Sequence, residues 1–231
     1  MTQQLRGLGY VVNRETVRLC VKELDPEGVL QRSRHRLVRR TYVARGPNYL
    51  WHMDGYDKLK PYGFCIHGAI DGFSRKILWL KVSSSNNDPR VIASHYLECI
   101  DRLNLVPRCI RADRGSENVM VCGMQRFLRR DGIDSVAGDK SFLYGTSTSD
   151  QRIEAWWSIL KKSRTAWWIN FFKDLIELGI YDPSLIEHKV CMKFSIMSLI
   201  QKDLDETKLL WNNHNIRKVR NSECPNGKPD V

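Results

Sequence analysis

Three strand-like runs follow one another closely in the first half of the chain, and this order constrains the fold most. The runs cover residues 49–54, 64–70 and 76–82. A tight connection at Asp71-Gly72 joins the last two, as is typical of antiparallel neighbours. A helix then follows to Leu103, because Asp88 is a good N-cap and Pro89 suits the first helical position.

From residue 108 the pattern alternates between strands and helices. A short strand ends at Asp113, and a helix capped by Ser116 runs to about Arg130. We expect a fifth short strand at residues 133–137, a polar and mobile loop over 138–150, and a helix over 151–162. The whole order predicts an α/β fold with a mixed five-stranded sheet flanked by helices, over residues 47–165.

The N-terminal residues 1–40 are predicted to be helical and basic. Asn13 is a candidate N-cap for a helix that ends before Asp25-Pro26. A turn followed by such a helix is typical of the second half of a helix-turn-helix, but also of an ordinary helical hairpin. Residues 31–40 hold five arginines, among them Arg34, Arg36, Arg39 and Arg40. This segment is compatible with a solvated linker, with phosphate contact and with nuclear import.

The C-terminal part, residues 166–231, is predicted to be a helical extension with breaks at Gly179 and Asp182-Pro183. Residues 167–176 form an unusually aromatic run. A core or dimer face is the ordinary interpretation of such a run, and base stacking is the alternative.

Charge and composition narrow the partners. The net charge of +11 on 231 residues favours a polyanionic partner, although ribosomal, histone-like and membrane-surface proteins share this property. No apolar run approaches the about 20 residues that a membrane span needs, so no membrane partner is expected. The seven cysteines include no CxxC pair, which indicates reduced, mostly buried thiols of a nuclear or cytosolic protein rather than a zinc knuckle.

Three acids stand where elements of this order begin or end. Asp54 closes the first strand, Asp113 closes the fourth, and Glu154 begins the helix after the loop. If strands one and four are neighbours, Asp54 and Asp113 lie side by side, and the apolar face around Trp157 packs Glu154 towards them. Three neighbouring carboxylates without His or Cys select Mg²⁺ or Mn²⁺, and two such ions promote displacement at phosphorus. The ordinary alternative is that these acids are turn residues, as Asp71 is expected to be.

Four motifs occur in an order that resembles the integrase catalytic core of retroviruses, retrotransposons and related DNA transposons. They are Trp51-His52-Met53-Asp54-Gly55, Ile70-Asp71-Gly72-Phe73-Ser74-Arg75, Arg111-Ala112-Asp113-Arg114-Gly115-Ser116-Glu117-Asn118 and Gln151-Arg152-Ile153-Glu154. Within this group the chain is most similar to the stand-alone, transposon-derived integrase core proteins of animal genomes, and the likeness spans about residues 47–220. The segment Trp211-Asn212-Asn213-His214 is similar to the family's post-core segment.

The resemblance implies a ribonuclease H-like fold and a metal triad of Asp54, Asp113 and Glu154. It implies two Mg²⁺ or Mn²⁺ ions with DNA bound, DNA end cleavage and strand transfer, and a dimer or larger homo-oligomer. Lys161 matches a position where the family places a lysine against DNA, and Lys162 is expected to join it. No small-molecule cofactor is implied, and a DNA-directed enzyme is expected in the nucleus, with a cytoplasmic fraction as the alternative.

Three positions depart from the family pattern. The interval of 41 residues between Asp113 and Glu154 is longer than in retroviral relatives, Asp150 stands where relatives often carry Asn, and Arg114 replaces a small polar residue. The family's N-terminal zinc-binding domain has no counterpart, and the sequence starts within a helix-turn-helix-like unit. These features are compatible with a truncated gene product, and we keep a second hypothesis: a domesticated, catalytically silent DNA-binding protein.

Overall fold

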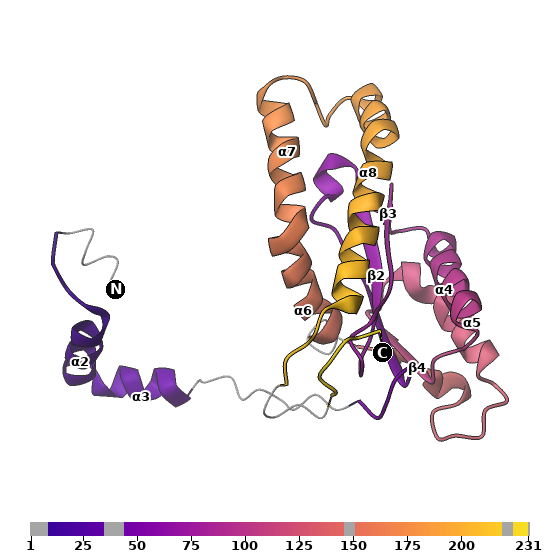
Figure 1. Cartoon of the computed structure of the whole chain (residues 1–231), viewed down its shortest axis with the longest axis horizontal. Coiled ribbons are helices and arrows are strands. Elements are labelled where there is room, and N and C mark those ends of the chain that lie inside the picture. Colours follow the sequence, from indigo (N-terminus) through magenta and orange to yellow (C-terminus); the bar gives the residue numbers. More distant parts are fainter. Residues whose placement is uncertain (1–8, 35–43, 146–150, 219–223, 231) are drawn as a thin grey trace. The chain divides into compact units, whose positions relative to one another are not determined.

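The computed structural model describes residues 9–34, 44–145, 151–218 and 224–230. The chain forms two compact units, residues 1–41 and 42–231. In the first, α2 (Arg14–Leu24) is followed after Asp25 by α3 (Pro26–Arg34) (Figure 1). The predicted cap is confirmed, because the Oδ1 atom of Asn13 accepts a hydrogen bond from the Thr16 amide at 2.7 Å. Part of the turn before α2 lies outside the described residues, so the helix-turn-helix stays a prediction.

The second unit is built on one mixed sheet. Its strands are β1 (Leu50–Tyr56), β2 (Cys65–Asp71), β3 (Ile77–Ser83), β4 (Cys109–Ala112) and β5 (Phe142–Tyr144). They lie in the order β3-β2-β1-β4-β5. The first three pair antiparallel, whereas β4 pairs parallel with both β1 and β5. This arrangement confirms the ribonuclease H-like fold and makes β1 and β4 neighbours.

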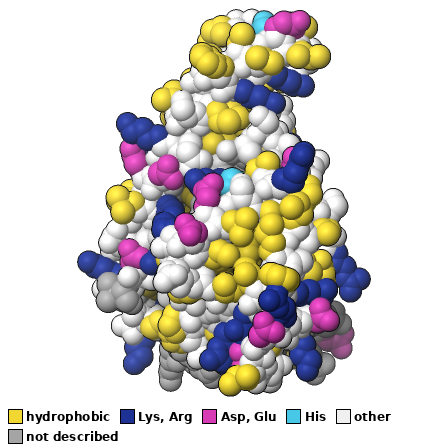
Figure 2. Space-filling model, turned by 90° about the vertical axis from the view of Figure 1, so that its right-hand side faces the viewer, with side chains coloured by type: hydrophobic (Ala, Val, Ile, Leu, Met, Phe, Trp, Pro, Cys, Tyr) yellow, Lys and Arg dark blue, Asp and Glu magenta, His cyan; other side chains and the backbone are white. Residues whose placement is uncertain are grey.

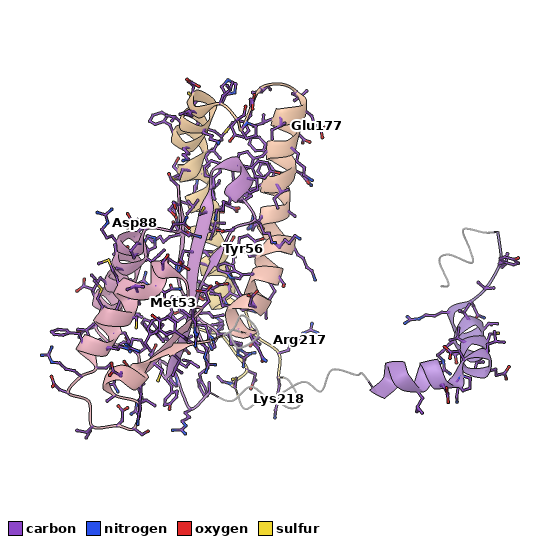
Figure 3. All side chains as sticks on the ribbon, turned by 180° about the vertical axis from the view of Figure 1, so that it is seen from behind. Met53, Tyr56, Asp88, Glu177, Arg217 and Lys218 are labelled. Atoms are coloured by element: carbon purple, nitrogen blue, oxygen red, sulfur yellow. The ribbon has the colours of Figure 1, made fainter. Side chains whose placement is uncertain are left out.

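Helices cover both faces of the sheet. On one face lie α4 (Pro89–Leu103) and α5 (Val119–Leu128); on the other lie α6 (Gln151–Leu160), α7 (Ala166–Glu177) and α8 (Ile186–Asn213) (Figure 1). Side chains alternate between two cores, so that Met53 joins the α4–α5 side and Tyr56 the α6–α8 side. Figure 3 shows both residues in the middle of the unit, on β1.

The helix that carries Glu154 continues without a break into α7. Residues Lys161–Thr165 between α6 and α7 form a π-helical segment, which widens the helix locally. The chain then turns at Gly179 and returns as α8, so the predicted breaks are confirmed (Figure 1). Within the aromatic run, Trp168 and Phe172 are buried, as the core interpretation predicted, whereas Trp167 is exposed.

α8 covers the outer edge of β3 with two amide side chains. Asn212 accepts a hydrogen bond from the Ile77 amide at 2.8 Å and donates one to the Ile77 carbonyl at 3.0 Å. Gln201 accepts from the Val82 amide and donates to the Leu80 carbonyl, both at 3.0 Å. These side-chain amides satisfy backbone groups at the edge of β3, where a further strand is missing. Asn212 of the Trp-Asn-Asn-His segment therefore has a structural role, whereas Asn213 is exposed.

Two local predictions around β4 and β5 are wrong. Residues 133–137 form no strand, because Ile133 has no buried face and Asp134 is held in a turn by Arg129. The fifth strand lies instead within the expected loop, where buried Phe142 pairs with Ile110 of β4. Ser116 is not the cap of a helix; it begins the short 3-10 turn Ser116–Asn118, which Gly115 precedes.

All seven cysteines are free thiols. Five are buried, as expected, and Cys20 and Cys191 are exposed. Among the described residues, no helix is long and apolar enough to cross a membrane.

Candidate active site

The sheet brings Asp54 and Asp113 together. The parallel register of β1 and β4 pairs His52 with Arg111, and two residues further along each chain the same register leads to Asp54 and Asp113. Neighbouring strands lie about 4.8 Å apart, so the two carboxylates belong to one site. Asp54 does not close β1 as predicted, because Gly55 and Tyr56 continue the pairing with β2.

Asp54 is a half-buried carboxyl group held by an indole. The Trp157 Nε1–H group donates a hydrogen bond to its Oδ2 atom at 2.9 Å. Burial raises the pKa of Asp54 to about 7, the Trp157 hydrogen bond opposes this rise, and the charges of Glu154 and Asp113 add to it. The charges of Asp113 and Glu154 thus act on the Asp54 carboxyl in the folded protein.

Trp157 reaches Asp54 because the sheet leaves room for its ring. Gly68 of β2 pairs with Asp54, and a Cβ atom on Gly68 would lie 2.8 Å from the Trp157 ring. Tyr56 packs against the same ring at a centroid distance of 5.0 Å, and its hydroxyl bonds to that of Thr165 at 2.8 Å. The sequence predicted that Trp157 packs; its hydrogen bond to Asp54 was missed.

Asp113 follows β4 and is exposed. Its Oδ1 atom accepts hydrogen bonds from the Gly115 amide at 3.1 Å and from the Asn118 side-chain amide at 2.9 Å. Asn118 is buried, and among the described residues its own Oδ1 atom has no hydrogen-bond partner. Asn118 thus positions the Asp113 carboxylate. The sequence placed Asn118 at the end of the motif around Asp113 but did not predict this task.

Glu154 is exposed in the first turn of α6, beside buried Ile153 and one turn before Trp157. The buried face anchors the helix to the sheet and leaves the Glu154 carboxylate free to move on its side chain. Lys161 and Lys162 are exposed in the π-helical segment that follows. Of the predicted DNA-contacting arginines, Arg34 ends α3, and Arg36, Arg39 and Arg40 lie outside the described residues.

The three carboxylates have the chemistry that a hard divalent cation needs, but their present arrangement is too open to hold one. Carboxylate oxygens are the ligands that Mg²⁺ and Mn²⁺ prefer, and a cation among them would relieve the repulsion that adds to the raised pKa of Asp54. Among the described residues, however, no group of three or more His, Cys, Asp or Glu side chains is arranged to hold a metal ion. Ion binding thus requires the exposed carboxylates to move inward.

Asp71 is separate from this site. It is buried at the end of β2 and accepts hydrogen bonds from the Asn48 amide at 2.9 Å and from the Ser74 amide and hydroxyl at 2.8 Å. The expected turn role of Asp71-Gly72 is confirmed.

The chain resembles known proteins in sequence, through a family model, and in structure. The family model described as integrase core domain matches residues 41–226. Two structures of the HTLV-2 integrase catalytic core domain in complex with magnesium, one trimeric and one dimeric, are similar to it at 16% identity and a TM-score of 0.45. The alignments cover 78% of this chain and 95% and 96% of those chains. No curated protein matches the chain significantly.

Proposed function

The chain belongs to the integrase core domain family, and on this premise we propose that it is a divalent-metal-dependent polynucleotidyl transferase that cleaves DNA ends and joins them to target DNA. The observation that carries the proposal is geometric: the register of β1 and β4 brings Asp54 beside Asp113, and Trp157, from the helix that carries Glu154, donates a hydrogen bond to Asp54 at 2.9 Å. Such convergence of carboxylates costs stability, and a cation is the usual compensation.

Each residue of the site has a defined task in this proposal. Asp54, Asp113 and Glu154 would hold the ions, with Trp157 and Asn118 orienting the two aspartates. When bound, two Mg²⁺ or Mn²⁺ ions supply an activated attacking oxygen and a stabilised leaving oxygen for in-line displacement at phosphorus. Lys161 and Lys162, which directly follow α6, would bind the DNA phosphates next to the reacting group.

The direct test is an activity assay on labelled linear duplexes with different ends, in the presence of Mn²⁺ or Mg²⁺. We expect cleavage or joined products from the wild type, loss of at least about a hundredfold in Asp113→Asn, and full activity in Asp131→Asn, an exposed acid outside the site. Equal product from wild type and Asp113→Asn would show that the products come from another source.

A second function is favoured by the open spacing of the acids. A protein whose carboxylates never close on an ion would be a DNA-binding descendant without strand transfer. Metal binding separates the two functions: Mn²⁺ should raise the melting temperature of the wild type and leave Asp54→Asn unchanged if the site takes up metal. No shift in either protein would favour the silent form.

The basic segment around Arg34, Arg36, Arg39 and Arg40 belongs to the same proposal, as a DNA contact and as a signal for import into the nucleus. Each phosphate contact contributes about 0.9 to the slope of log affinity against log salt. Replacing the four arginines by glutamine should therefore lower this slope by up to about 4 if all of them bind phosphate. An unchanged slope would make the segment a linker, and cytoplasmic retention of the wild type would contradict nuclear import.

A further inference from the structure

Trp167 is a large aromatic side chain held in place at the surface. It is 61% exposed, whereas the next residue, Trp168, is buried. Phe171 stacks against its ring at 5.4 Å and an interplanar angle of 8°, and Trp168 meets the ring edge-on at 4.9 Å. The indole is thus oriented by its neighbours and still offers much of its surface to a ligand.

A cavity of about 420 Å³ adjoins Trp167 and is lined by Ser163, Arg164, Trp167, Trp168 and Asp203. This volume lies within the range of about 300–1,000 Å³ that is usual for small-molecule sites. The Asp203 carboxylate accepts a hydrogen bond from Trp168 Nε1 at 3.0 Å and pairs with Arg164 at 3.3 Å. Asp203 thus fixes two lining residues of the cavity, the Arg164 guanidinium group and the Trp168 ring.

The helical segment that contributes Ser163 and Arg164 to the cavity is basic. Lys161 and Lys162 are exposed in the same π-helical segment that contributes Ser163 and Arg164. An aromatic platform beside cationic side chains is the combination by which proteins bind single-stranded nucleic acid, because bases stack on the ring and phosphates pair with the cations. An apolar protein partner would instead leave these cations unpaired.

We propose that this cavity binds an unpaired DNA base, stacked on Trp167, with a flanking phosphate on Arg164 and the phosphates nearer the carboxylates on Lys161 and Lys162. The proposal rests on the function proposed above, because the base belongs to the DNA on which the carboxylates act. Trp167 follows Glu154 by 13 residues of one continuous helical course, or about 20 Å along its axis.

The test compares the binding of two fluorescent DNAs, a blunt duplex and the same duplex with an unpaired tail. We expect Trp167→Ala to weaken binding of the tailed DNA by about 5–100-fold, to change binding of the blunt duplex little, and to leave the salt slope unaltered. Trp167→Phe should retain most of the affinity. Lys161→Gln with Lys162→Gln should instead weaken both DNAs and lower the salt slope.

Phe127→Ala is the matched control, because Phe127 is also an exposed aromatic ring beside an arginine, with the Arg130 guanidinium 4.0 Å from its centroid. It should leave both affinities unchanged. If the wild type binds both DNAs and Trp167→Ala binds the tailed DNA equally well, the base site is wrong and the proposed function stands. If the wild type binds neither DNA, both are wrong. A change in the sedimentation of Trp167→Ala without DNA would assign Trp167 to a protein interface instead.

Discussion

Asp54 is the residue at which the stability of the fold and the chemistry of the site conflict most. Its carboxyl is partly withdrawn from water, one indole stabilises its charge, and two further acids oppose that charge. In a protein without function such a carboxyl would be replaced by a neutral side chain. The metal ion proposed above would supply the counter-charge that the Asp54 carboxylate lacks in these surroundings.

The raised pKa of Asp54 makes stability depend on pH in a defined direction. Between the ordinary value of 3.8 and about 7, the folded protein binds a proton at Asp54 that the unfolded chain has lost. The free energy of unfolding therefore falls as the pH rises through this interval, because the folded protein must give up this proton. In the absence of metal, we expect Asp54→Asn to be more stable than the wild type by about 1–3 kcal/mol at pH 8 and little different at pH 4.

Thermal unfolding of both proteins in chelator, from pH 4 to pH 8, measures this difference. Asp131→Asn should follow the wild type at every pH, because Asp131 is exposed. A constant difference between Asp54→Asn and the wild type across the range would show that Asp54 does not titrate in this interval.

A comparison of Trp157 with its neighbour Trp156 tests the role of the indole N–H group that binds Asp54. Both are buried, but Trp157 donates to Asp54, whereas Trp156 Nε1 has no partner among the described residues. Trp157→Phe should raise the pKa of Asp54 further and shift Mn²⁺-dependent stabilisation to higher pH, because the charged form loses its donor. Trp156→Phe should leave the pH dependence unchanged. Identical pH profiles for the two variants would contradict a positioning role for Trp157.

At the scale of elements, the edge of β3 depends on side chains of α8. Asn212→Ala would leave both backbone groups of Ile77 without their partners, and we expect a loss of about 2 kcal/mol in the free energy of unfolding. The neighbouring Asn213 is exposed, and within the described part of the chain its side chain donates a hydrogen bond to the Leu209 carbonyl of the same helix. Asn213→Ala should therefore cost less than about 0.5 kcal/mol. Chemical denaturation of the two variants measures the contrast, and equal losses would show that β3 does not need this cover.

Regular elements were predictable where local chemistry and tertiary packing agree. The run around Ala69, the Asp88-Pro89 helix start and the Gly179 break have strong local signals, and the structure contains each of them. β5 was misplaced because its three residues form a strand only through the pairing of Phe142 with Ile110, which no local pattern reveals. The π-helical segment was missed for the same reason: nothing in Lys161-Lys162-Ser163-Arg164-Thr165 marks it.

The candidate site was predictable to the level of its acids. The ordered motifs pointed to Asp54, Asp113 and Glu154, and the structure brings Asp54 beside Asp113 and joins it through Trp157 to the helix of Glu154. Their role as metal ligands stays a prediction. The residues that position them were not identifiable in this way, because the tasks of Asn118 and Gly68 arise only when β1, β2 and the turn after β4 are assembled. Sequence patterns report the periodicity of a chain, whereas positioning residues act between elements that are far apart in sequence.

At the scale of the second unit, the α7–α8 hairpin ends in apolar surface that its own core does not use. Ile180, Ile186, Val190 and Phe194 are largely exposed there, with Phe194 at 88%. Figure 2 shows hydrophobic side chains gathered at this end, uppermost in the view. The aromatic run 167–176 was the expected dimer face, but its residues Trp168 and Phe172 are buried, so the hairpin end is the better candidate for self-association.

The hairpin end gathers exposed apolar side chains from α8 and from the turn before it, and apolar surface of this kind is typical of an interface between proteins. We therefore expect the purified protein to form dimers at micromolar concentration, and Phe194→Ser to raise the dissociation constant at least about tenfold, because central aromatic residues dominate such interfaces. Val119→Ser is the control, since Val119 is an exposed apolar residue of α5, away from the hairpin. Sedimentation equilibrium measures all three proteins; a monomeric wild type, or dimers that Phe194→Ser leaves unchanged, would place the interface elsewhere.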